Sequence, residues 1–438
     1  MVQQSELYQR GLEQLRAGNY EEAKRLFRDH EEKSGSASET KALLREAEAR
    51  LSKGDLNGAA PLYDQLLERN PALPEVYLGL TRIALFTNEL EAARVHASAA
   101  VRLGPGLGLA WALMGLVHEA SGDVKSALEH LGKAIELSPN VFLCQFNYGR
   151  VLAASGHPAQ AILSLTQATE LEPRNPNGFY ILGMAYRKAQ QYESALKAFD
   201  QAKELDPKNV DMWATLADVL FEVKEFQAAR DMLDKGLERC GDHPALLEKA
   251  LATAMMQSDA EGAIRYVERE LKVAPEHEQG WLNLANLRAM TNDFARSEEA
   301  ARELLRRNPR NWEAWFHLGN LFEAQTDDAK AEEAYRKAVE LAPNDWKTLT
   351  NLAGLLVQTT SKQKHAEALP LLEKALPLAP RGEWRVHYNL ALAHTRLGNR
   401  EKALELAQRI QREAPAGDDM VEEARKLESN LKEAAQRS

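Results

Sequence analysis

Prolines recur along this chain at a nearly constant interval. The spacing is 34 residues over most of the sequence, and only the last two steps lengthen, to 37 and 35 residues, while Gly241 fills the one gap. Proline cannot continue a helix, and glycine commonly ends one. Breakers at a fixed interval predict many short units that stack on their neighbours, in place of one or two compact cores. The phased prolines are Pro71, Pro105, Pro139, Pro173, Pro207, Pro275, Pro309, Pro343, Pro380 and Pro415.

Small residues run in phase with the prolines. Twelve residues before each breaker lies an alanine or, once, a serine. In most units another small residue lies about twelve positions earlier, as Gly115, Gly149 and Gly183 do. Small side chains at matched positions allow two helix backbones to approach closely, so each unit is expected to be a pair of helices. The phased series is Ala23, Ala59, Ala93, Ala127, Ala161, Ala195, Ala229, Ala263, Ser297, Ala331, Ala368 and Ala403.

One unit illustrates the predicted helix pair. Trp111, Gly115 and His118 are spaced 4 and 3 residues apart, which places them on one face of a helix. A turn is expected at residues 122–123, and Ala127 and Leu131 then mark the inner face of a second helix. A single helical hairpin cannot bury its own apolar face, whereas stacked hairpins can. The sequence therefore predicts an all-α solenoid.

The pattern resembles that of the tetratricopeptide repeat family. The resemblance implies a right-handed superhelical solenoid of about twelve helix-turn-helix repeats over residues 4–417, with residues 418–438 as a C-terminal capping helix and tail. The expected repeats begin near residues 4, 40, 74, 108, 142, 176, 210, 244, 278, 312, 346 and 384. The best-matched unit carries Phe179, Leu182, Gly183, Tyr186, Tyr192, Ala195, Phe199, Ala202 and Pro207.

Composition excludes several classes of protein. The chain has 438 residues, of which 44% are hydrophobic, and this argues against wholesale disorder. Its net charge of −10 makes nucleic acid an unsuitable partner. Two cysteines offer no disulfide framework, and no apolar run is long enough to insert into a membrane. Residues 1–16 lack the apolar core of a signal peptide, so a cytoplasmic protein is expected. The oligomeric state is left open.

No catalytic or cofactor motif stands apart from the repeat. The glycine-rich segment at residues 104–108 lies on the expected turn between repeats, and no strand precedes it as a phosphate loop requires. His387 and His394 share a helix face, but both occupy positions where other repeats carry core aromatic residues. We therefore expect no enzymatic activity, no cofactor and no metal ion.

Asparagines recur at two positions of the first helix in the later repeats. In tetratricopeptide folds, positions 2, 5, 6, 9, 12 and 13 face the concave groove. A carboxamide both donates and accepts hydrogen bonds, so it can hold a peptide backbone without selecting side chains. The resulting ladder resembles that of the O-GlcNAc transferase superhelix; the alternative is ordinary solvated surface. The candidate residues are Asn147, Asn283, His317, Asn351 and Asn389 at position 6, and Asn286 and Asn320 at position 9.

A second resemblance concerns the carboxylate clamp of tetratricopeptide cochaperones. Asn320, Asn351 and Arg385 match three of its five positions, but Phe316 and Asn389 stand where lysine and arginine are required. This departure argues against a ligand held by its C-terminal carboxylate. Tryptophans also open the last three repeats, at residues 312, 346 and 384, where they either pack against the preceding repeat or form an exposed aromatic lip.

These features predict a non-catalytic scaffold that binds a peptide segment of a partner protein in the concave groove. Its candidate binding residues are the seven named above together with Arg385. The alternative is a substrate-presenting or assembly subunit of a glycosyltransferase or a cell-envelope biogenesis system, working with a catalytic partner on a separate chain.

Overall fold

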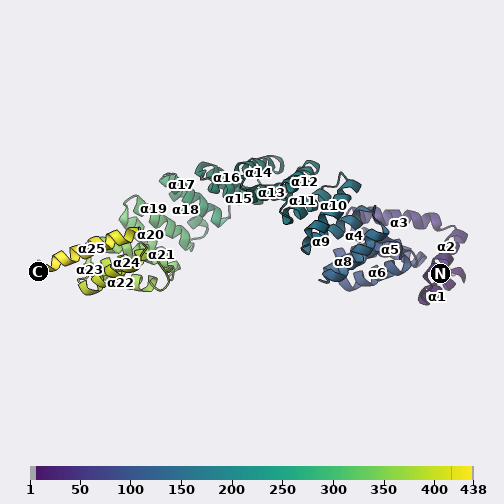
Figure 1. Ribbon diagram of the computed structural model, residues 1–438, viewed down its shortest axis with the longest axis horizontal. Coiled ribbons are helices and arrows are strands. Elements are labelled where there is room, and N and C mark those ends of the chain that lie inside the picture. The colour runs from purple at the N-terminus through teal and green to yellow at the C-terminus, as the bar shows by residue number, and fades with distance from the viewer. Residues whose placement is uncertain (1–5, 416, 437–438) are drawn as a thin grey trace. The chain divides into compact units, whose positions relative to one another are not determined.

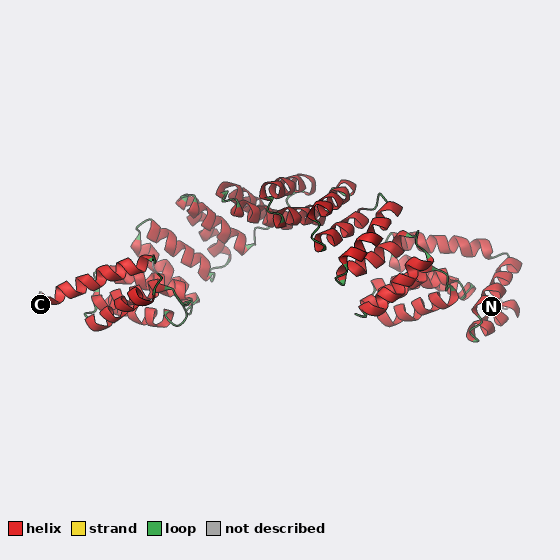
Figure 2. Ribbon diagram, in the orientation of Figure 1, coloured by secondary structure: helices red, strands yellow, loops and turns green. Residues whose placement is uncertain are grey.

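The computed structural model describes residues 6–415 and 417–436 of the chain. Over these residues every regular element is an α-helix, and 25 helices are present (Figure 2). The predicted all-α class is confirmed. The expected start of the first repeat near residue 4 and the end of the tail at residues 437–438 lie outside the described residues.

The chain divides into two compact units, Met1–Met232 and Leu233–Ser438, and the division falls within α14 (Phe226–Cys240) (Figure 1). The first unit holds α1 (Glu6–Arg16), α2 (Tyr20–Ser34), α3 (Ala37–Ser52), α4 (Leu56–Arg69), α5 (Pro74–Phe86), α6 (Leu90–Leu103), α7 (Gly108–Ala120), α8 (Val124–Leu137), α9 (Phe142–Ala154), α10 (Pro158–Leu171), α11 (Pro176–Lys188), α12 (Tyr192–Leu205) and α13 (Val210–Glu222). The second holds α15 (Pro244–Met256), α16 (Ala260–Val273), α17 (Glu278–Met290), α18 (Phe294–Arg307), α19 (Trp312–Ala324), α20 (Asp328–Leu341), α21 (Trp346–Gln358), α22 (Lys362–Ala375), α23 (Trp384–Arg396), α24 (Arg400–Glu413) and α25 (Asp419–Gln436).

Each odd-numbered helix from α1 to α11 and from α15 to α23 forms a hairpin with the helix that follows it. The turn within most hairpins contains a residue with positive φ, a conformation that ends a helix and reverses the chain. In two of these turns the residue with positive φ is a glycine, Gly122 or Gly156, as expected from the conformational freedom of glycine. Asn88, Asn292 and Thr326 adopt the same conformation without being glycine, at φ near 60°. Short turns of one conformation thus keep the hairpins alike.

The two helices of a hairpin approach closely where the small residues lie. A Cβ atom added at Gly115 would sit 2.6 Å from the Leu131 side chain on the partner helix, and one added at Gly319 would collide with the Tyr335 ring. Glycine at these points therefore makes room for a large residue opposite.

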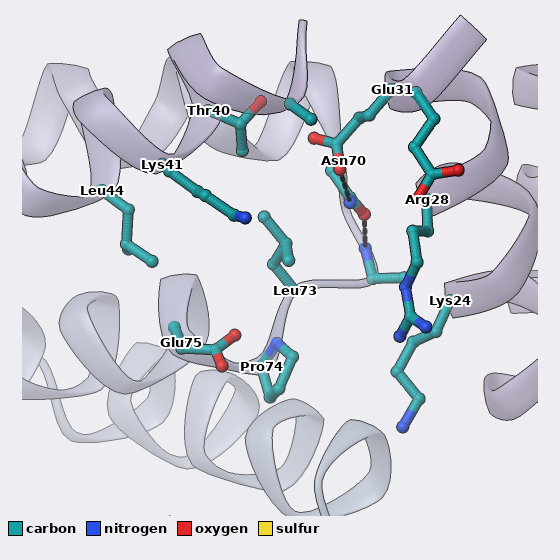
Figure 3. Close-up of a pocket in the computed structure, with 13 residues that line it drawn as sticks. Lys24, Arg28, Glu31, Thr40, Lys41, Leu44, Asn70, Leu73, Pro74 and Glu75 are labelled. Carbon is teal, nitrogen blue, oxygen red and sulfur yellow. Dashed lines mark hydrogen bonds between the residues drawn. The ribbon is translucent and has the colours of Figure 1, made fainter.

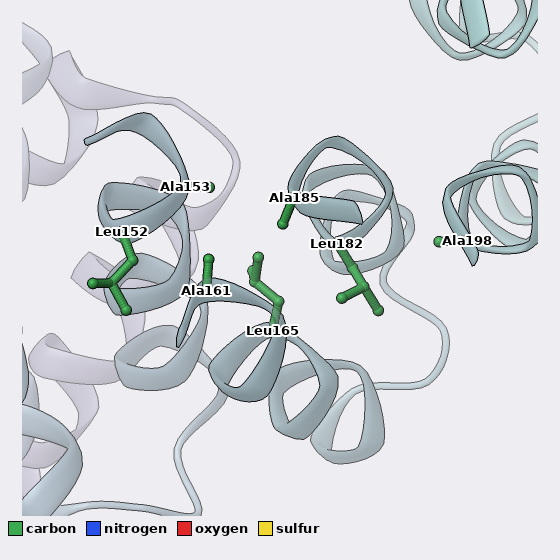
Figure 4. Packing of buried hydrophobic residues seen from close by; sticks show 7 residues of the cluster. All are labelled: Leu152, Ala153, Ala161, Leu165, Leu182, Ala185 and Ala198. Carbon is green, nitrogen blue, oxygen red and sulfur yellow. The ribbon is translucent and has the colours of Figure 1, made fainter. Parts of the chain in front are cut away.

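Packing between hairpins uses the phased alanines. Ala161 and Leu165 of α10 are fully buried, and they lie in one cluster with Leu152 of α9 and with Leu182 and Ala185 of α11 (Figure 4). The cluster therefore joins one hairpin to the next within the first unit.

The phased prolines have a role beyond ending helices. In several repeats a side chain at the fourth position of the first helix donates a hydrogen bond to the proline carbonyl oxygen six residues earlier. This bond ties the turn between hairpins to the helix that follows it. The donors are Tyr77 Oη to Pro71 at 2.9 Å, Trp111 Nε1 to Pro105 at 2.9 Å, Gln145 Nε2 to Pro139 at 3.0 Å, Trp213 Nε1 to Pro207 at 2.9 Å, Trp281 Nε1 to Pro275 at 2.8 Å and Trp315 Nε1 to Pro309 at 3.2 Å.

The first hairpin departs from the regular stacking. Tyr8 of α1 and Phe27 of α2 pack against Ala72, in the turn before α5, and Leu103, at the end of α6. Tyr8 Oη also donates to the Glu68 carbonyl oxygen at 2.7 Å. The α1–α2 hairpin thus covers the ends of later helices, and contacts between α2 and α3 are sparse.

At the other end of the chain, α25 packs on the last hairpin. Ala424, Leu427 and Leu431 are buried against α23 and α24. Among the helices of residues 6–415 and 417–436, none is long and apolar enough to cross a membrane.

Replacing Trp213 by Phe should destabilise the protein more than replacing Trp384 by Phe. Both rings are buried, but Trp213 Nε1 donates to Pro207, whereas Trp384 Nε1 is buried without a partner. The first change removes a hydrogen bond worth about 0.5–1.5 kcal/mol, and the second removes a donor whose burial is unfavourable. Urea denaturation followed by far-ultraviolet circular dichroism measures both. Equal losses of the free energy of unfolding would mean that the hydrogen bond from Trp213 to the Pro207 carbonyl oxygen contributes nothing to stability.

Candidate functional site

Two of the predicted asparagines meet directly in the second unit. Asn351 on α21 donates through Nδ2 to Asn320 Oδ1 on α19, at 2.9 Å. Tyr335, on the second helix of the α19–α20 hairpin, donates through Oη to the same Asn320 oxygen at 2.7 Å. Asn320 is therefore fixed from two sides, by the neighbouring repeat and by its own.

The Tyr335 hydroxyl connects this pair to a carboxylate. Its Oη lies 2.6 Å from Glu323 Oε2, so its single proton serves either Glu323 or Asn320. Burial, reinforced by the adjacent Glu323 carboxylate, raises the pKa of Tyr335 well above that of a free tyrosine. The hydroxyl consequently remains a proton donor at any ordinary pH, while the Asn351 amide, which donates to Asn320 Oδ1, keeps that carboxamide in one orientation.

Asn389 extends the row into the next repeat. Its Nδ2 donates at 3.4 Å to the carbonyl oxygen of Thr350, the residue immediately before Asn351 in the chain. Gly354 makes room for this side chain, because a Cβ atom at Gly354 would lie 2.9 Å from Asn389 Nδ2. Three consecutive first helices, α19, α21 and α23, thus present adjoining carboxamides, which we call the carboxamide row: Asn320, Asn351 and Asn389.

The contacts within the carboxamide row leave a defined set of groups for a ligand. Asn320 Oδ1 is occupied, so its Nδ2 is left as a donor. Asn351 and Asn389 each use Nδ2 internally, so their Oδ1 atoms are left as acceptors. A peptide backbone offers the complementary carbonyl and amide groups.

His317 does not belong to this row, and its predicted role in binding is wrong. Only 6% of its surface is exposed, and its Nε2 lies 2.8 Å from Ser297 Oγ. Ser297 is fully buried and donates to the Ala285 carbonyl oxygen at 2.8 Å, so the imidazole donates to the hydroxyl. The Ser297 hydroxyl therefore draws the histidine into the core, where burial lowers its pKa to about 4.

The other predicted site residues lie on helix surfaces without joining the row. On α17, Asn283 Oδ1 accepts from Gln279 Nε2 of the same helix at 3.0 Å, and Asn286 is exposed. Arg385 is exposed at the start of α23. In the first unit, Asn147 donates back to the Leu143 carbonyl oxygen of its own helix at 2.8 Å.

Ion pairs occupy the equivalent faces of the first unit. Arg150 on α9 holds Glu119 on α7 through two hydrogen bonds, at 2.8 and 2.5 Å. Arg82 on α5 likewise pairs with Glu48 on α3 at 2.9 Å. These charges satisfy one another between neighbouring repeats, so this face offers fewer free polar groups than the carboxamide row.

Aromatic side chains flank the row on α19. The Trp312 and Phe316 rings lie 6.4 Å apart, and Phe316 lies 6.1 Å from Tyr335. Trp312 and Phe316 are partly exposed. Trp346 is also partly exposed, and the Lys347 ammonium group lies over its ring. Trp384, in contrast, is buried against α24 and α25. Packing is therefore the role of Trp384, whereas the aromatic lip stays a prediction for Trp312 and Trp346.

Within residues 6–415 and 417–436, no group of three or more His, Cys, Asp or Glu side chains could hold a metal ion. Cys144 is buried, and burial raises the pKa of its thiol to about 11, so it is a poor nucleophile.

Family models match both ends of the chain. Tetratricopeptide repeat models match residues 8–74, 50–116 and 109–141, and the model of the tetratricopeptide domain of cytochrome c-type biogenesis protein H matches residues 288–421. The chain is a tetratricopeptide repeat protein. One further model, that of subunit 3 of the anaphase-promoting complex, or cyclosome, matches residues 157–236 of these repeats.

Solved tetratricopeptide structures resemble the chain at low identity. PilF of Pseudomonas aeruginosa is 22% identical, and the alignment covers 51% of this chain and 99% of that one, with a TM-score of 0.41. Yeast Tom70 is 16% identical over 92% of this chain and 97% of its own, with a TM-score of 0.39. A Thermus thermophilus tetratricopeptide protein, TTC0263, is 24% identical over 42% and 99%, with a TM-score of 0.38. No curated protein matches the chain.

Sequence reasoning missed the residues that orient the carboxamide row. Tyr335 was hidden because its ring occupies a core position that carries Phe199 in the sixth repeat. A sequence signal was available, because the hydroxyl group of a buried tyrosine needs a hydrogen-bond partner. Tyr63 occupies the same position in the second repeat, and its hydroxyl donates to Glu48 at 2.7 Å. A tyrosine in this otherwise apolar place indicates a polar partner on the first helix.

Acid should destabilise the protein partly through His317. Its pKa falls from about 6.5 unfolded to about 4 folded, so the unfolded chain takes up the proton first. The neutral imidazole stabilises the fold fully above pH 6.5, and this contribution, of order 3 kcal/mol, is lost as the pH falls to 4.

Denaturation of wild type and His317→Gln between these pH values measures the difference. The glutamine amide can still donate to Ser297 but does not titrate, so its stability should fall less steeply with acid. The exposed His157→Gln change provides the control. If the free energy of unfolding fell with pH equally in wild type and His317→Gln, His317 would not be a source of the acid sensitivity.

Proposed function

We propose that this tetratricopeptide protein is a non-catalytic scaffold that binds an extended peptide segment of a partner protein. In this proposal the repeats occupy residues 4–417, and residues 418–438 form the cap and tail. The observation that carries the proposal is the carboxamide row, in which internal hydrogen bonds fix the orientation of Asn320 and Asn351 before any ligand arrives. A preoriented group loses less entropy on binding than a mobile one.

The row is suited to the backbone of a peptide. It offers one donor, Asn320 Nδ2, followed by two acceptors, Asn351 Oδ1 and Asn389 Oδ1, on successive repeats. Because every residue carries the same backbone groups, such contacts hold many sequences, and neighbouring side chains must supply preference. Asn283, Asn286 and Arg385 would extend the polar contacts beyond the row.

In this proposal, exposed apolar side chains on the repeats before the row and on α19 supply that preference. Met255 and Met256 at the end of α15 and Met290 at the end of α17 are 53%, 57% and 72% exposed. Unbranched methionine side chains adapt to varied apolar partners. Together with Trp312 and Phe316, they favour a peptide that carries apolar residues beside its held backbone.

A second candidate function is a part in the biogenesis of c-type cytochromes. It is favoured by the match of the cytochrome c-type biogenesis protein H domain to residues 288–421, which include the whole carboxamide row. This candidate is a specific form of the alternative in which the scaffold is an assembly subunit for a separate catalytic chain. Deleting the gene and staining cell extracts for covalently bound haem tests it: unchanged c-type cytochromes would exclude it.

Removing the carboxamide row should abolish tight peptide binding without unfolding the protein. Phage-displayed random peptides selected on the wild-type chain provide the probe, and fluorescence polarisation of the selected peptides gives their affinities. Replacing Asn320, Asn351 and Asn389 together by Ala should weaken binding about ten- to a thousandfold, since each lost hydrogen bond costs about 0.5–1.5 kcal/mol.

The matched control is Asn430→Ala, which changes an exposed asparagine on α25. It should leave binding unchanged, and circular dichroism should show both variants to be folded. If the triple variant binds the selected peptides as wild type does, the carboxamide row is ordinary surface. If selection enriches no peptide at all, the scaffold proposal itself is contradicted.

Gly354→Ala should change stability and binding in opposite directions. Alanine favours a helix interior by about 0.5–1 kcal/mol over glycine, so the melting temperature should hold or rise. The added methyl group would displace the Asn389 carboxamide, which lies within 2.9 Å of its position. Affinity for the selected peptides should therefore fall several-fold. A variant that gains stability and keeps full affinity would remove Asn389 from the site.

A further inference from the structure

Two cations adjoin the carboxamide row at the start of its last two helices. Lys347 is the second residue of α21, and Arg385 is the second residue of α23. Each lies four residues before a member of the row, Asn351 or Asn389, and residues four apart are neighbours on one face of a helix. Helices α21 and α23 also contact each other. The two cations therefore lie beside the surface that is proposed to hold a peptide.

Neither cation is neutralised by a neighbour. Both residues are exposed, and within the described part of the chain neither Lys347 nor Arg385 forms an ion pair or donates a hydrogen bond. The Lys347 ammonium group lies over the Trp346 ring, 5.8 Å from its centroid, which holds it at the helix surface. Asp345, the acidic residue nearest to Lys347 in the sequence, already accepts from the backbone nitrogen and the hydroxyl of Thr348, at 2.7 and 2.6 Å. Two positive charges thus remain available on this surface.

Several cations on the first helices of the first unit are, in contrast, accompanied by acidic groups. Arg187 on α11 pairs with Glu222 on α13, in the same way as the two ion pairs described above. Lys41 on α3 shares an open pocket with Glu31 and Glu75 (Figure 3). An acidic neighbour thus accounts for a cation that serves the contact between repeats, and the two cations of the second unit call for a different explanation.

The stability of the helices does not explain these cations either. The N-terminus of a helix carries partial positive charge, so it favours an acidic side chain and disfavours a basic one. Acidic residues are indeed second in α5, α13 and α19, as Glu75, Asp211 and Glu313. Among the odd-numbered helices from α1 to α23, as far as the structure describes them, only α21 and α23 carry Lys or Arg within their first four residues. An anionic partner gives the two cations a role that the fold does not.

We propose that the partner segment held by the carboxamide row carries aspartate or glutamate side chains, which pair with Lys347 and Arg385. This inference rests on the proposed peptide-binding function and adds the class of segment that is bound. The row holds the backbone of many sequences, whereas two unpaired cations select those with negative charge. The acidic groups belong to side chains within the segment, because Phe316 and Asn389 stand where the clamp for a terminal carboxylate has lysine and arginine.

The charge along these helices also limits where the acidic side chains lie. The second residue of the preceding first helix, α19, is Glu313, which is exposed. An acidic side chain over α19 meets a like charge, whereas one over α21 or α23 meets a cation. The segment is therefore acidic beside α21 and α23, and neutral or apolar beside α19, where Trp312 and Phe316 are partly exposed.

Peptide selection followed by binding measurements tests the proposal. Random peptides displayed on phage are selected on the full wild-type chain and, in parallel, on the chain that carries both Lys347→Gln and Arg385→Gln. Peptides selected on wild type should be enriched in Asp and Glu relative to the unselected library, and those selected on the double variant should not.

Fluorescence polarisation then measures the contribution of charge. Replacing the acidic residues of a selected peptide by Asn and Gln should weaken its binding to wild type about two- to thirtyfold at low salt, as expected for two exposed ion pairs. At about 1 M NaCl, where charges are screened within about 3 Å, this difference should largely disappear. Amidation of the peptide's C-terminus should leave its affinity unchanged.

The double variant should lose affinity for a wild-type-selected peptide by the same factor. Circular dichroism should show it folded, with a melting temperature that holds or rises, because it removes cations from two helix N-termini. Lys347→Arg with Arg385→Lys keeps both charges and should keep most of the affinity. The matched control is Lys125→Gln, since Lys125 is likewise the exposed second residue of its helix, α8, but lies in the first unit. It should leave binding unchanged.

The outcomes separate this inference from the function on which it rests. If selection on wild type enriches no peptide, both are contradicted. If the selected peptides need Asn320, Asn351 and Asn389 but bind the folded double variant as tightly as wild type, peptide binding is supported and the acidic segment is wrong. Equal affinity of the acidic peptides and their Asn and Gln analogues would have the same meaning. Loss of binding on amidation would assign the recognised charge to the peptide's terminus and contradict the pairing with side chains.

Discussion

The close approach of the two helices in each hairpin is the contact on which the rest of this structure depends. It requires a small residue on one helix and a large one opposite, as Gly115 and Leu131 or Gly319 and Tyr335 provide. The pair forms a wedge whose remaining apolar surface only another hairpin can cover, and the buried alanines of the second helices bring that neighbour close. Stability is therefore distributed over successive interfaces, and no single core determines the fold.

The same contact links the core to the candidate binding surface. Tyr335 packs its ring against Gly319, and because the helices are so close, its hydroxyl reaches Asn320 and Glu323 on the first helix. A phenylalanine would fill the same space without orienting a surface carboxamide. The neighbouring repeat completes the arrangement through Asn351. Geometry that first serves packing thus also fixes a hydrogen-bonding row, which spares a ligand part of the cost of ordering it.

The all-helical fold could be predicted from the sequence because the phasing of Pro, Gly and Ala reflects contacts that are local in the chain. Asn320 and Asn351 could be predicted for the same reason, since positions 9 and 6 of a first helix are both expected on its groove face. His317 could not, because its environment depends on a residue twenty positions earlier: Ser297 replaces the usual alanine and provides a buried acceptor. The α1–α2 junction also escaped prediction. Its packing on Ala72 and Leu103 joins residues far apart in the sequence, where repeat periodicity carries no information.

Regular and irregular stacking favour different kinds of recognition. Where hairpins repeat, equivalent residues lie side by side on successive first helices, and they suit a ligand that also repeats, such as a peptide backbone. Where the first hairpin leaves the register, side chains from α2, α3 and the turn before α5 meet at one open pocket instead. The groups there come from unlike elements, so they do not recur at a fixed interval. The surface formed by successive first helices is therefore the part of the fold that suits a repeating ligand.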